Sequence, residues 1–421
     1  MTTTLICALD AFMQSGTTVP NAPLQRFRVG KLRVLFERSP GPLTGIVLGA
    51  RSGSRFDGER PGIAHLAEHM LFQGTKTLDH AAINERAAEL GGDHDASTSY
   101  EDLNVTFQVL NADAASAIAL IAEQVRHSTV PEDRLENERQ VVAQEIRGHR
   151  EDAISYLSDE TWGRFYGGGL RLSPSGTLAS VRTIQALDIR RFLRKRLVGA
   201  NVVLSIVGDP PLHEIKRALA EEFGGLARGT ACQADGAHVV RTGEVRLRRS
   251  GLTQLYLTML FSVPPARRAL LALGLALEIV GTDPDGRLYH EVREKSGLSY
   301  DLWADLPGGA GWAALAVGAV AERRAELRLR RAIDRVFETA ATEGFRAEEI
   351  VRARRKVRYR YARLSEAKLD RAAAHAASIL YGAPRLDEAE SIVCSLRREE
   401  IEGAWRRALR GPRLTGVLTG S

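Results

Sequence analysis

The chain has 421 residues, of which 44% are hydrophobic, 26% charged and 6% aromatic. This composition is ordinary for globular proteins and excludes wholesale disorder, a collagen-like chain and a disulfide scaffold. At about 150 residues per domain, the length indicates two or three domains. The net charge of +6 reflects 58 basic and 52 acidic residues. Because the basic residues are mostly Arg scattered among acids, with no aromatic-interleaved run, we expect no nucleic-acid binding.

The sequence carries no feature of a disulfide-bonded, thiolate-bound or membrane-spanning protein. Its cysteines are Cys7, Cys232 and Cys394, too far apart for a CxxC pair. No apolar run approaches the ~18 residues of a membrane span. Residues 1–22 lack the basic region of a signal peptide and are expected to be a weakly ordered lead. We therefore predict a cytoplasmic protein without membrane contact.

Polarity patterns and turn residues predict alternating strands and helices in both halves. The first half has expected strands at 27–36, from 46, at 105–109 and at 201–209, and helices at 63–72, 79–90, 112–127, 131–150 and 186–198. The second half has expected strands at 255–261 and 311–320, and helices at 265–281, 322–343 and 347–363.

The two halves share an internal echo. When residues 188–208 are shifted by 212, they align without a gap on 400–420, and each segment reads as helix, Gly turn, strand and Gly. The simplest interpretation is a duplication that gives two α/β domains of similar topology. We expect the first domain at 23–228, a polar, Gly-containing linker at 229–244 and the second domain at 245–421.

The string HLAEH at 65–69 is the most informative segment of the chain. His65 and His69 are spaced i,i+4 in a helix-compatible stretch, so both imidazoles project from one face, with Glu68 on the same side. Two neutral imidazoles on one turn suit Zn²⁺, and an adjacent carboxylate can take a proton from an attacking water. Surface His–Glu clusters also arise by chance, but the apolar flanks favour a buried setting in which these polar groups need partners.

A catalytic zinc usually has three protein ligands. The predicted helix at 131–150 offers Glu138 and Glu145, which are seven residues apart and therefore share a face. The other interpretation is an exposed acidic face with Arg partners. Composition alone does not choose among these acids.

The segments HLAEHMLFQGT and ERQVVAQEI resemble the pitrilysin/insulin-degrading enzyme family of zinc metallopeptidases, and the length resembles its short-chain branch, which includes the mitochondrial processing peptidase subunits. The resemblance implies an α+β fold of two homologous domains, each a mainly antiparallel sheet packed with helices. It assigns one zinc ion to His65, His69 and Glu145, which follows His69 by 76 residues. It makes Glu68 the general base and Glu138 a carboxylate that orients a ligand histidine.

Two further segments carry the resemblance. RLYHEVREKSGLSY at 287–300 implies that Arg293 and Tyr300 reach the active site from the second domain and bind the substrate or the oxyanion. GGDHDASTSY at 91–100 implies an edge strand that pairs with extended substrate, with Asp95 and Ala96 at the substrate-binding position. Asp95 stands where the family usually has Asn, and an ionised Asp cannot donate the amide hydrogen bond.

The resemblance implies a zinc-dependent endopeptidase that hydrolyses extended peptides or unfolded segments in an enclosed chamber. This chain carries both the zinc motif and the Arg–Tyr pair. The resemblance therefore favours a homodimer over a heterodimer with a related subunit. The alternative is a non-catalytic scaffold, as resemblance to the core subunits of respiratory complexes allows, or a partner subunit of a processing-peptidase-like heterodimer. The natural substrate is not specified by the sequence.

Overall fold

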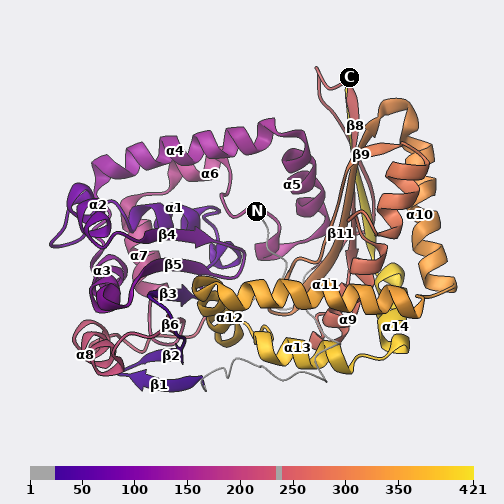
Figure 1. Cartoon of the computed structure of the whole chain (residues 1–421). Coiled ribbons are helices and arrows are strands. Elements are labelled where there is room, and N and C mark those ends of the chain that lie inside the picture. The colour runs from indigo at the N-terminus through magenta and orange to yellow at the C-terminus, as the bar shows by residue number, and fades with distance from the viewer. Residues whose placement is uncertain (1–23, 234–238) are drawn as a thin grey trace.

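The computed structural model describes residues 24–233 and 239–421, so the predicted lead at 1–22 lies outside the described residues. They form two sheets packed with helices, in two halves that stand side by side (Figure 1). This arrangement confirms the predicted α+β class with two sheet-and-helix domains. The domain boundaries drawn from the sequence stay a prediction.

The first sheet has the strand order β1-β2-β6-β3-β5-β4, and β2 and β6 are its one parallel pair. Its strands are β1 (Gln25–Val29), β2 (Leu32–Arg38), β3 (Leu43–Ala50), β4 (Asp93–Thr98), β5 (Leu103–Leu110) and β6 (Val202–Gly208). The central strands β3 and β6 are buried almost throughout, which explains their runs of Val, Leu and Ile. β4 forms one edge of the sheet.

The second sheet repeats the central part of this topology, with the strand order β10-β11-β8-β12-β7 and with β9 also paired to β11. Its strands are β7 (Gly243–Arg248), β8 (Gln254–Ser262), β9 (Ser299–Asp305), β10 (Gly308–Gly309), β11 (Trp312–Glu322) and β12 (Arg413–Thr419). β12 runs parallel to β7 and antiparallel to β8, as β6 runs parallel to β2 and antiparallel to β3. The strands that close the two segments related by the 212-residue shift, β6 and β12, therefore lie in equivalent positions in the two sheets.

The helices include every one that the sequence predicts. Those of the first half are α1 (Ile63–Met70), α2 (His80–Glu89), α3 (Ala114–His127), α4 (Glu132–Glu151), α5 (Ala153–Phe165), α6 (Leu178–Thr183), α7 (Ala186–Arg196) and α8 (Leu212–Phe223). Those of the second half are α9 (Arg267–Val280), α10 (Glu326–Thr342), α11 (Ala347–Glu366), α12 (Lys368–Leu380), α13 (Leu386–Ser395) and α14 (Arg398–Arg410). A π-helical segment, Tyr289–Lys295, precedes β9.

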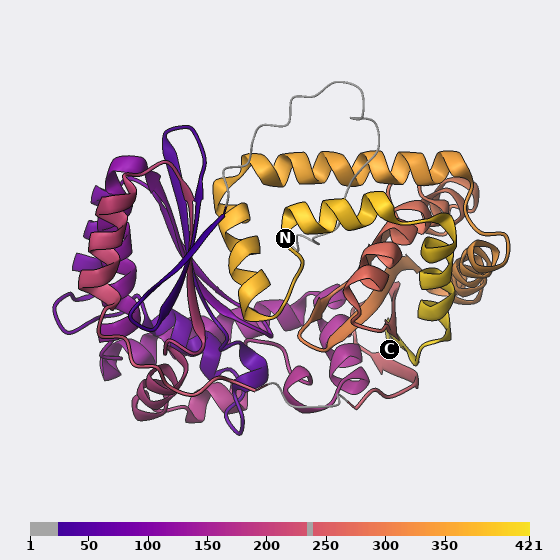
Figure 2. The same ribbon diagram turned by 90° about the horizontal axis from the view of Figure 1, so that it is seen from below.

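The two halves exchange one helix each. α12 follows α11 in the second half, yet it packs on β3 and β6 of the first sheet, where Ala372, Ala376 and Leu380 join the core (Figure 2). In the same way, α5 of the first half packs on β8 and β12 of the second sheet, and Leu157 contacts Leu418. A further buried cluster joins Phe165 and Tyr166 to Leu260 and Trp312. Burial of apolar surface at these contacts holds the halves together.

The prediction of one continuous strand at 27–36 is wrong. The chain turns at Gly30, whose φ of +55° lies in the left-handed region, and β1 and β2 form a hairpin. Alternating polarity continues through the turn in the sequence, so the pattern alone did not reveal it.

Within the two described stretches, no helix combines the length and the apolar character that crossing a membrane requires.

Candidate metal centre

Helix α1 begins at a capped turn. The Asp57 carboxylate accepts hydrogen bonds from the backbone N–H of Gly62, at 2.6 Å, and of Ala64, at 3.1 Å. Gly62 itself has a φ of +89°, a conformation that favours glycine. Burial raises the pKa of Asp57 to about 7, although these two hydrogen bonds and Arg196 act in the opposite direction. The cap fixes where the helix starts and therefore which way its side chains point.

The apolar face of α1 is buried in the first core, with Ile63, Leu66 and Met70 at most 3% exposed. This burial turns the other face of the helix, which carries His65 and His69, toward α4. The ring centroids of the two histidines lie 4.8 Å apart. The predicted i,i+4 geometry is therefore present.

Helix α4 places Glu145 opposite both imidazoles. Its Oε2 lies 3.8 Å from Nε2 of His65 and 3.8 Å from Nε2 of His69. These three ligand atoms all lie within 4.8 Å of one another. The convergence arises because Val142 and Ile146 bury one face of α4 against the core.

Glu138 lies two turns before Glu145 on α4. Its Oε2 is 2.8 Å from Nδ1 of His69, and its side chain is 15% exposed. This contact leaves Nε2 of His69 turned toward Glu145. A carboxylate in this position fixes the tautomer and orientation of a ligand histidine.

The protonation tendencies of the two imidazoles differ. Burial, together with the charge of His69, lowers the pKa of His65 to about 4, so His65 is neutral at pH 7. Burial also opposes the charge of His69, but Glu138, Glu145 and Glu68 raise the pKa of His69 above its ordinary value. A bound cation would take the place of the His69 proton between these carboxylates.

The residues fit a zinc ion by an observation independent of the sequence motif. The distances of 3.8 Å from the imidazole nitrogens to the carboxylate are too long for hydrogen bonds. They are close to the ~3.4 Å that separates ligand atoms around a tetrahedral zinc with bonds of about 2.1 Å. Two nitrogens and one oxygen are also a donor set that catalytic zinc sites use.

Glu68 lies on the same side of α1 as the cluster. Burial raises its pKa, although the neighbouring Thr98 hydroxyl and His69 act in the opposite direction. Its Oε2 atom is buried and, within the described residues, has no hydrogen-bond partner. A carboxylate of this kind has a free oxygen and a strengthened affinity for a proton.

Strand β4 lies beside α1 and pairs only with β5 among the described strands. Asp95 and Ala96 occupy its middle, opposite Thr106 and Val105. The Asp95 carboxylate accepts a hydrogen bond from the N–H of Ala96 at 2.8 Å. The predicted edge position is present, and the Asp95 side chain is directed back onto its own strand.

Arg293 and Tyr300 lie in the other half of the molecule, in the π-helical segment and at the start of β9 (Figure 1). The Arg293 guanidinium stacks 4.3 Å from the centre of the Tyr300 ring and donates to the Tyr300 carbonyl at 3.3 Å. Tyr300 is 77% exposed. No hydrogen bond or ion pair within the described part of the chain joins either residue to α1 or α4.

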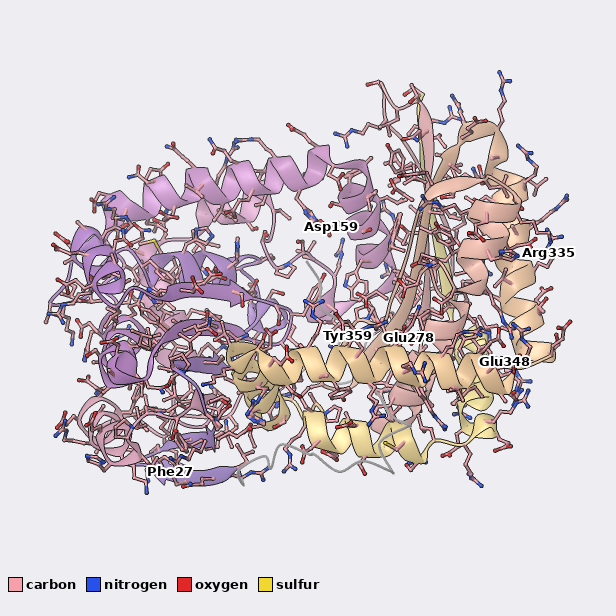
Figure 3. All side chains as sticks on the ribbon, in the orientation of Figure 1. Phe27, Asp159, Glu278, Arg335, Glu348 and Tyr359 are labelled. Atoms are coloured by element: carbon pink, nitrogen blue, oxygen red, sulfur yellow. The ribbon has the colours of Figure 1, made fainter. Side chains whose placement is uncertain are left out.

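The second half holds an ion pair where the first half holds the histidine–glutamate cluster. α9 packs on α11 as α1 packs on α4, and Glu278 of α9 pairs with Arg360 of α11. Figure 3 shows Glu278 beside α11. Shifting Glu145 by the 215 residues that separate α4 from α11 gives Arg360. A cation in place of the third ligand leaves no metal-binding set at this position.

A buried link between the halves was not predicted. Glu101, which follows β4, accepts hydrogen bonds through Oε1 from the Trp312 indole at 2.7 Å and the Ala310 N–H at 3.1 Å, and it pairs with Arg55. The Arg55 and Glu101 side chains are at most 4% exposed. An isolated acid in a turn gives no periodic signal, so the sequence offered no means of finding it.

Comparison with known proteins identifies the family. Residues 33–164 match the family described as Insulinase (Peptidase family M16), and residues 183–357 match the one described as Peptidase M16 inactive domain. The chain belongs to the M16 (insulinase) peptidase family.

Individual relatives agree. An uncharacterized zinc protease of Rickettsia bellii is 32% identical over 60% of this chain and 61% of its own length. The chain thus spans 61% of the length of each of the first two curated relatives that it matches. Subunit 1 of the Bos taurus mitochondrial cytochrome b-c1 complex is 25% identical over 51% of this chain and 45% of its own. A crystal structure described as a peptidase M16 inactive domain, from Pseudomonas fluorescens, has the same fold, with a TM-score of 0.87 at 21% identity over 94% of this chain and 98% of that chain.

Proposed function

We propose that this chain is a zinc-dependent endopeptidase that hydrolyses extended peptides or unfolded segments. The observation that carries the proposal is the convergence of His65, His69 and Glu145 beside Glu68, whose buried Oε2 has no hydrogen-bond partner within the described residues. The zinc protease names of relatives in the same family support it.

The metal ligands in this proposal are His65, His69 and Glu145, which would hold one zinc ion per chain. Bound zinc would supply Lewis acidity toward the scissile carbonyl and the attacking water. Glu138 holds the imidazole of His69 so that its Nε2 faces the site. The neutral state of His65 at pH 7 keeps its ring nitrogen available as a ligand.

Glu68 is the general base in this proposal. Its raised pKa and unpartnered Oε2 suit a carboxylate that accepts the proton of the attacking water and passes it to the leaving amine. Because Glu68 shares a helix face with the two histidines, its carboxylate would lie close to both the attacking water and the nitrogen of the leaving amine.

The edge strand β4 supports an extended substrate. A peptide that pairs with the free side of β4 would run past α1, where Glu68 lies. Asp95 and Ala96 would lie at this pairing edge. Since Asp95 bonds to its own strand, we propose that backbone pairing, not an amide side chain, anchors the peptide here.

We propose a homodimer in which Arg293 and Tyr300 complete the site of the partner copy. Both side chains lie in the second half, stacked on each other and away from α1, and Tyr300 is exposed. A guanidinium and a phenol hydroxyl are donors suited to an oxyanion. We also propose a cytoplasmic location, which rests on the sequence alone.

The second candidate is a non-catalytic subunit of a larger assembly. The similarity to the cytochrome b-c1 complex subunit favours it. The intact set of two histidines and three glutamates in α1 and α4 favours the peptidase.

One experiment separates the two candidates. Zinc-loaded wild type and Glu68→Gln are compared for zinc content and for digestion of a random peptide library. The peptidase predicts equal zinc, cleavage by the wild type, and a loss of about 10²-fold or more in the variant, as for removal of a general base. Equal cleavage by both proteins would refute the role of Glu68. Absence of cleavage by zinc-loaded wild type would favour the non-catalytic subunit.

A further inference from the structure

A cavity of about 360 Å³ lies at the junction of α4, α5 and the loop at 171–177, and the roles proposed above do not use it. One wall is formed by Asp159, Glu160 and Gly163 of α5, while Leu157 of the same helix packs on the second sheet. Figure 3 shows Asp159 on α5, on the side of the first half. Apart from Arg241, the residues that line the cavity belong to the half that carries the candidate metal centre.

The cavity adjoins the centre through two elements. His149 in its wall lies one turn after Glu145 on α4. Gly176 in its wall packs on Pro61 and Gly62 at the beginning of α1, so closely that a Cβ on Gly176 would lie 2.5 Å from the Pro61 carbonyl oxygen. A peptide with its scissile bond at the centre can therefore place a flanking group in this cavity.

The acidic groups of the cavity already have basic neighbours within it. Glu160 pairs with Arg164, one turn away on α5. His149 Nε2 lies 3.2 Å from Asp159 Oδ2. Burial raises the pKa of Asp159, although His149 lowers it. Neither carboxylate stands alone as a receptor for a basic side chain.

The remaining basic groups are in excess. Arg150, Arg171 and Arg241 also line the cavity. Within residues 24–233 and 239–421, no hydrogen bond or ion pair engages the side chain of Arg171 or Arg241. Each guanidinium therefore keeps its planar fork of donors available, a geometry that matches a carboxylate.

We propose that this cavity is a subsite for a carboxylate of the peptide substrate, held by Arg171 and Arg241. The inference rests on the peptidase function proposed above and specifies its substrate class as peptides with an acidic group beside the scissile bond. The carboxylate comes either from an Asp or Glu side chain or from the C-terminus of a short peptide. Both sources present the same planar anion to the two forks.

The cleavage test uses quenched fluorescent peptides in which one Asp is moved through each position around the scissile bond. Each peptide is compared with its Asn and Lys counterparts, and each is made with a free or an amidated C-terminus. Arg171 and Arg241 are exposed. We therefore expect one position at which Asp is preferred over Asn by about two- to fivefold in kcat/KM, the range of an exposed charge pair. Dependence on the free C-terminus instead would assign the site to the terminal carboxylate. A preference for Lys, or none in either series, would overturn the proposal.

The test of the residues uses the double variant Arg171→Gln/Arg241→Gln. The Asp-over-Asn or acid-over-amide ratio should fall to near one in this variant. A matched control, the double variant Arg328→Gln/Arg331→Gln, removes the same charge from exposed positions of α10 and should keep the wild-type ratio. An equal fall of the ratio in both variants would show long-range charge only and would overturn the subsite.

A binding arm separates failure of the subsite from failure of the proposed function. Anisotropy of the same fluorescein-labelled peptides is measured with Glu68→Gln, with and without the Arg171→Gln/Arg241→Gln changes. Acid-dependent binding that the two changes abolish supports the subsite even if the wild type cleaves none of the peptides. Equal affinity for the acidic peptides and for their Asn or amidated counterparts refutes the subsite, even if the wild type cleaves them efficiently.

Discussion

At the scale of single residues, Glu138 sets the tautomer and orientation of His69, one of the proposed zinc ligands. Its 2.8 Å contact to His69 Nδ1 fixes which nitrogen faces the site. We predict that Glu138→Gln weakens zinc binding by about 10- to 100-fold, the usual effect of losing a carboxylate that orients a ligand histidine. Competition with a fluorescent zinc chelator measures the change.

The control for this prediction is Glu136→Gln. Glu136 is 60% exposed on the same helix and pairs with Arg139 rather than with a histidine. Its loss should leave the zinc affinity unchanged. Equal weakening in both variants would mean that general acidity of α4, and not the contact to His69, supports the metal.

The candidate residues of α1 and α4 could be predicted because their geometry is local. An i,i+4 pair on a helix meets on one face wherever the helix lies, and the family resemblance supplied the distant Glu145. The contacts that position these elements are different. Glu101 meets Trp312 across 211 residues. Arg150, Arg171 and Arg241 of the cavity come from α4, from a loop and from the segment after residue 239. No spacing in the sequence encodes such meetings.

At the scale of elements, the beginning of α11 is held by a buried carboxylate. Glu349 accepts two hydrogen bonds from Arg287, at 3.0 and 2.7 Å, and one from the backbone N–H of Arg346 at 2.8 Å. Although burial acts in the opposite direction, these donors hold the pKa of Glu349 at about 2. The pair connects α11 to the segment that precedes β9.

This pKa predicts the pH dependence of stability. Because the folded value is depressed, the ionised Glu349 stabilises the fold fully above the ordinary pKa of 4.5, and this stabilisation is lost as pH falls toward 2. We expect Glu349→Gln to lower the free energy of unfolding by about 2 kcal/mol at pH 7. The deficit should shrink by about 1 kcal/mol at pH 4. Urea denaturation at the two pH values measures both.

The matched control is Glu348→Gln, a neighbour that is 60% exposed at the same end of α11 (Figure 3). It should change stability by less than about 0.5 kcal/mol at either pH. A pH-independent deficit in Glu349→Gln would contradict the assignment of the stabilisation to its ionised form.

The pattern of elements was largely predictable, and their partners were not. Periodicity predicted α1, α3, α4 and α7 because each buries one apolar stripe. It missed the hairpin turn at Gly30. It also could not show that α5 and α12 pack on the sheet of the other half, since an apolar stripe does not specify which sheet covers it.

At the scale of the whole molecule, the exchange of α5 and α12 fixes the halves of one chain to each other. The proposed oxyanion donors Arg293 and Tyr300 then belong to the half opposite α1. If a second copy brings them to the site, two inactive variants should complement each other. Mixing Glu68→Gln chains with Arg293→Ala chains should restore about a quarter of wild-type activity, because half of randomly mixed dimers are hybrids with one complete site of two.

As a control, each variant is taken through the same subunit exchange alone, under native conditions, and should remain inactive. A mixture no more active than its components, in a sample shown by mass spectrometry to contain hybrid dimers, would contradict the composite site. A stable, active monomer in light scattering would contradict the homodimer.

The central claim is that α1 and α4 together hold a zinc ion. Zinc K-edge X-ray absorption of the dialysed protein, with one equivalent of zinc, tests it most directly. The predicted spectrum has only nitrogen and oxygen neighbours at about 2.0–2.2 Å, with outer-shell scattering from two imidazoles that falls to one in His69→Ala. A sulfur shell at about 2.3 Å, or a spectrum unchanged by His69→Ala, would contradict it.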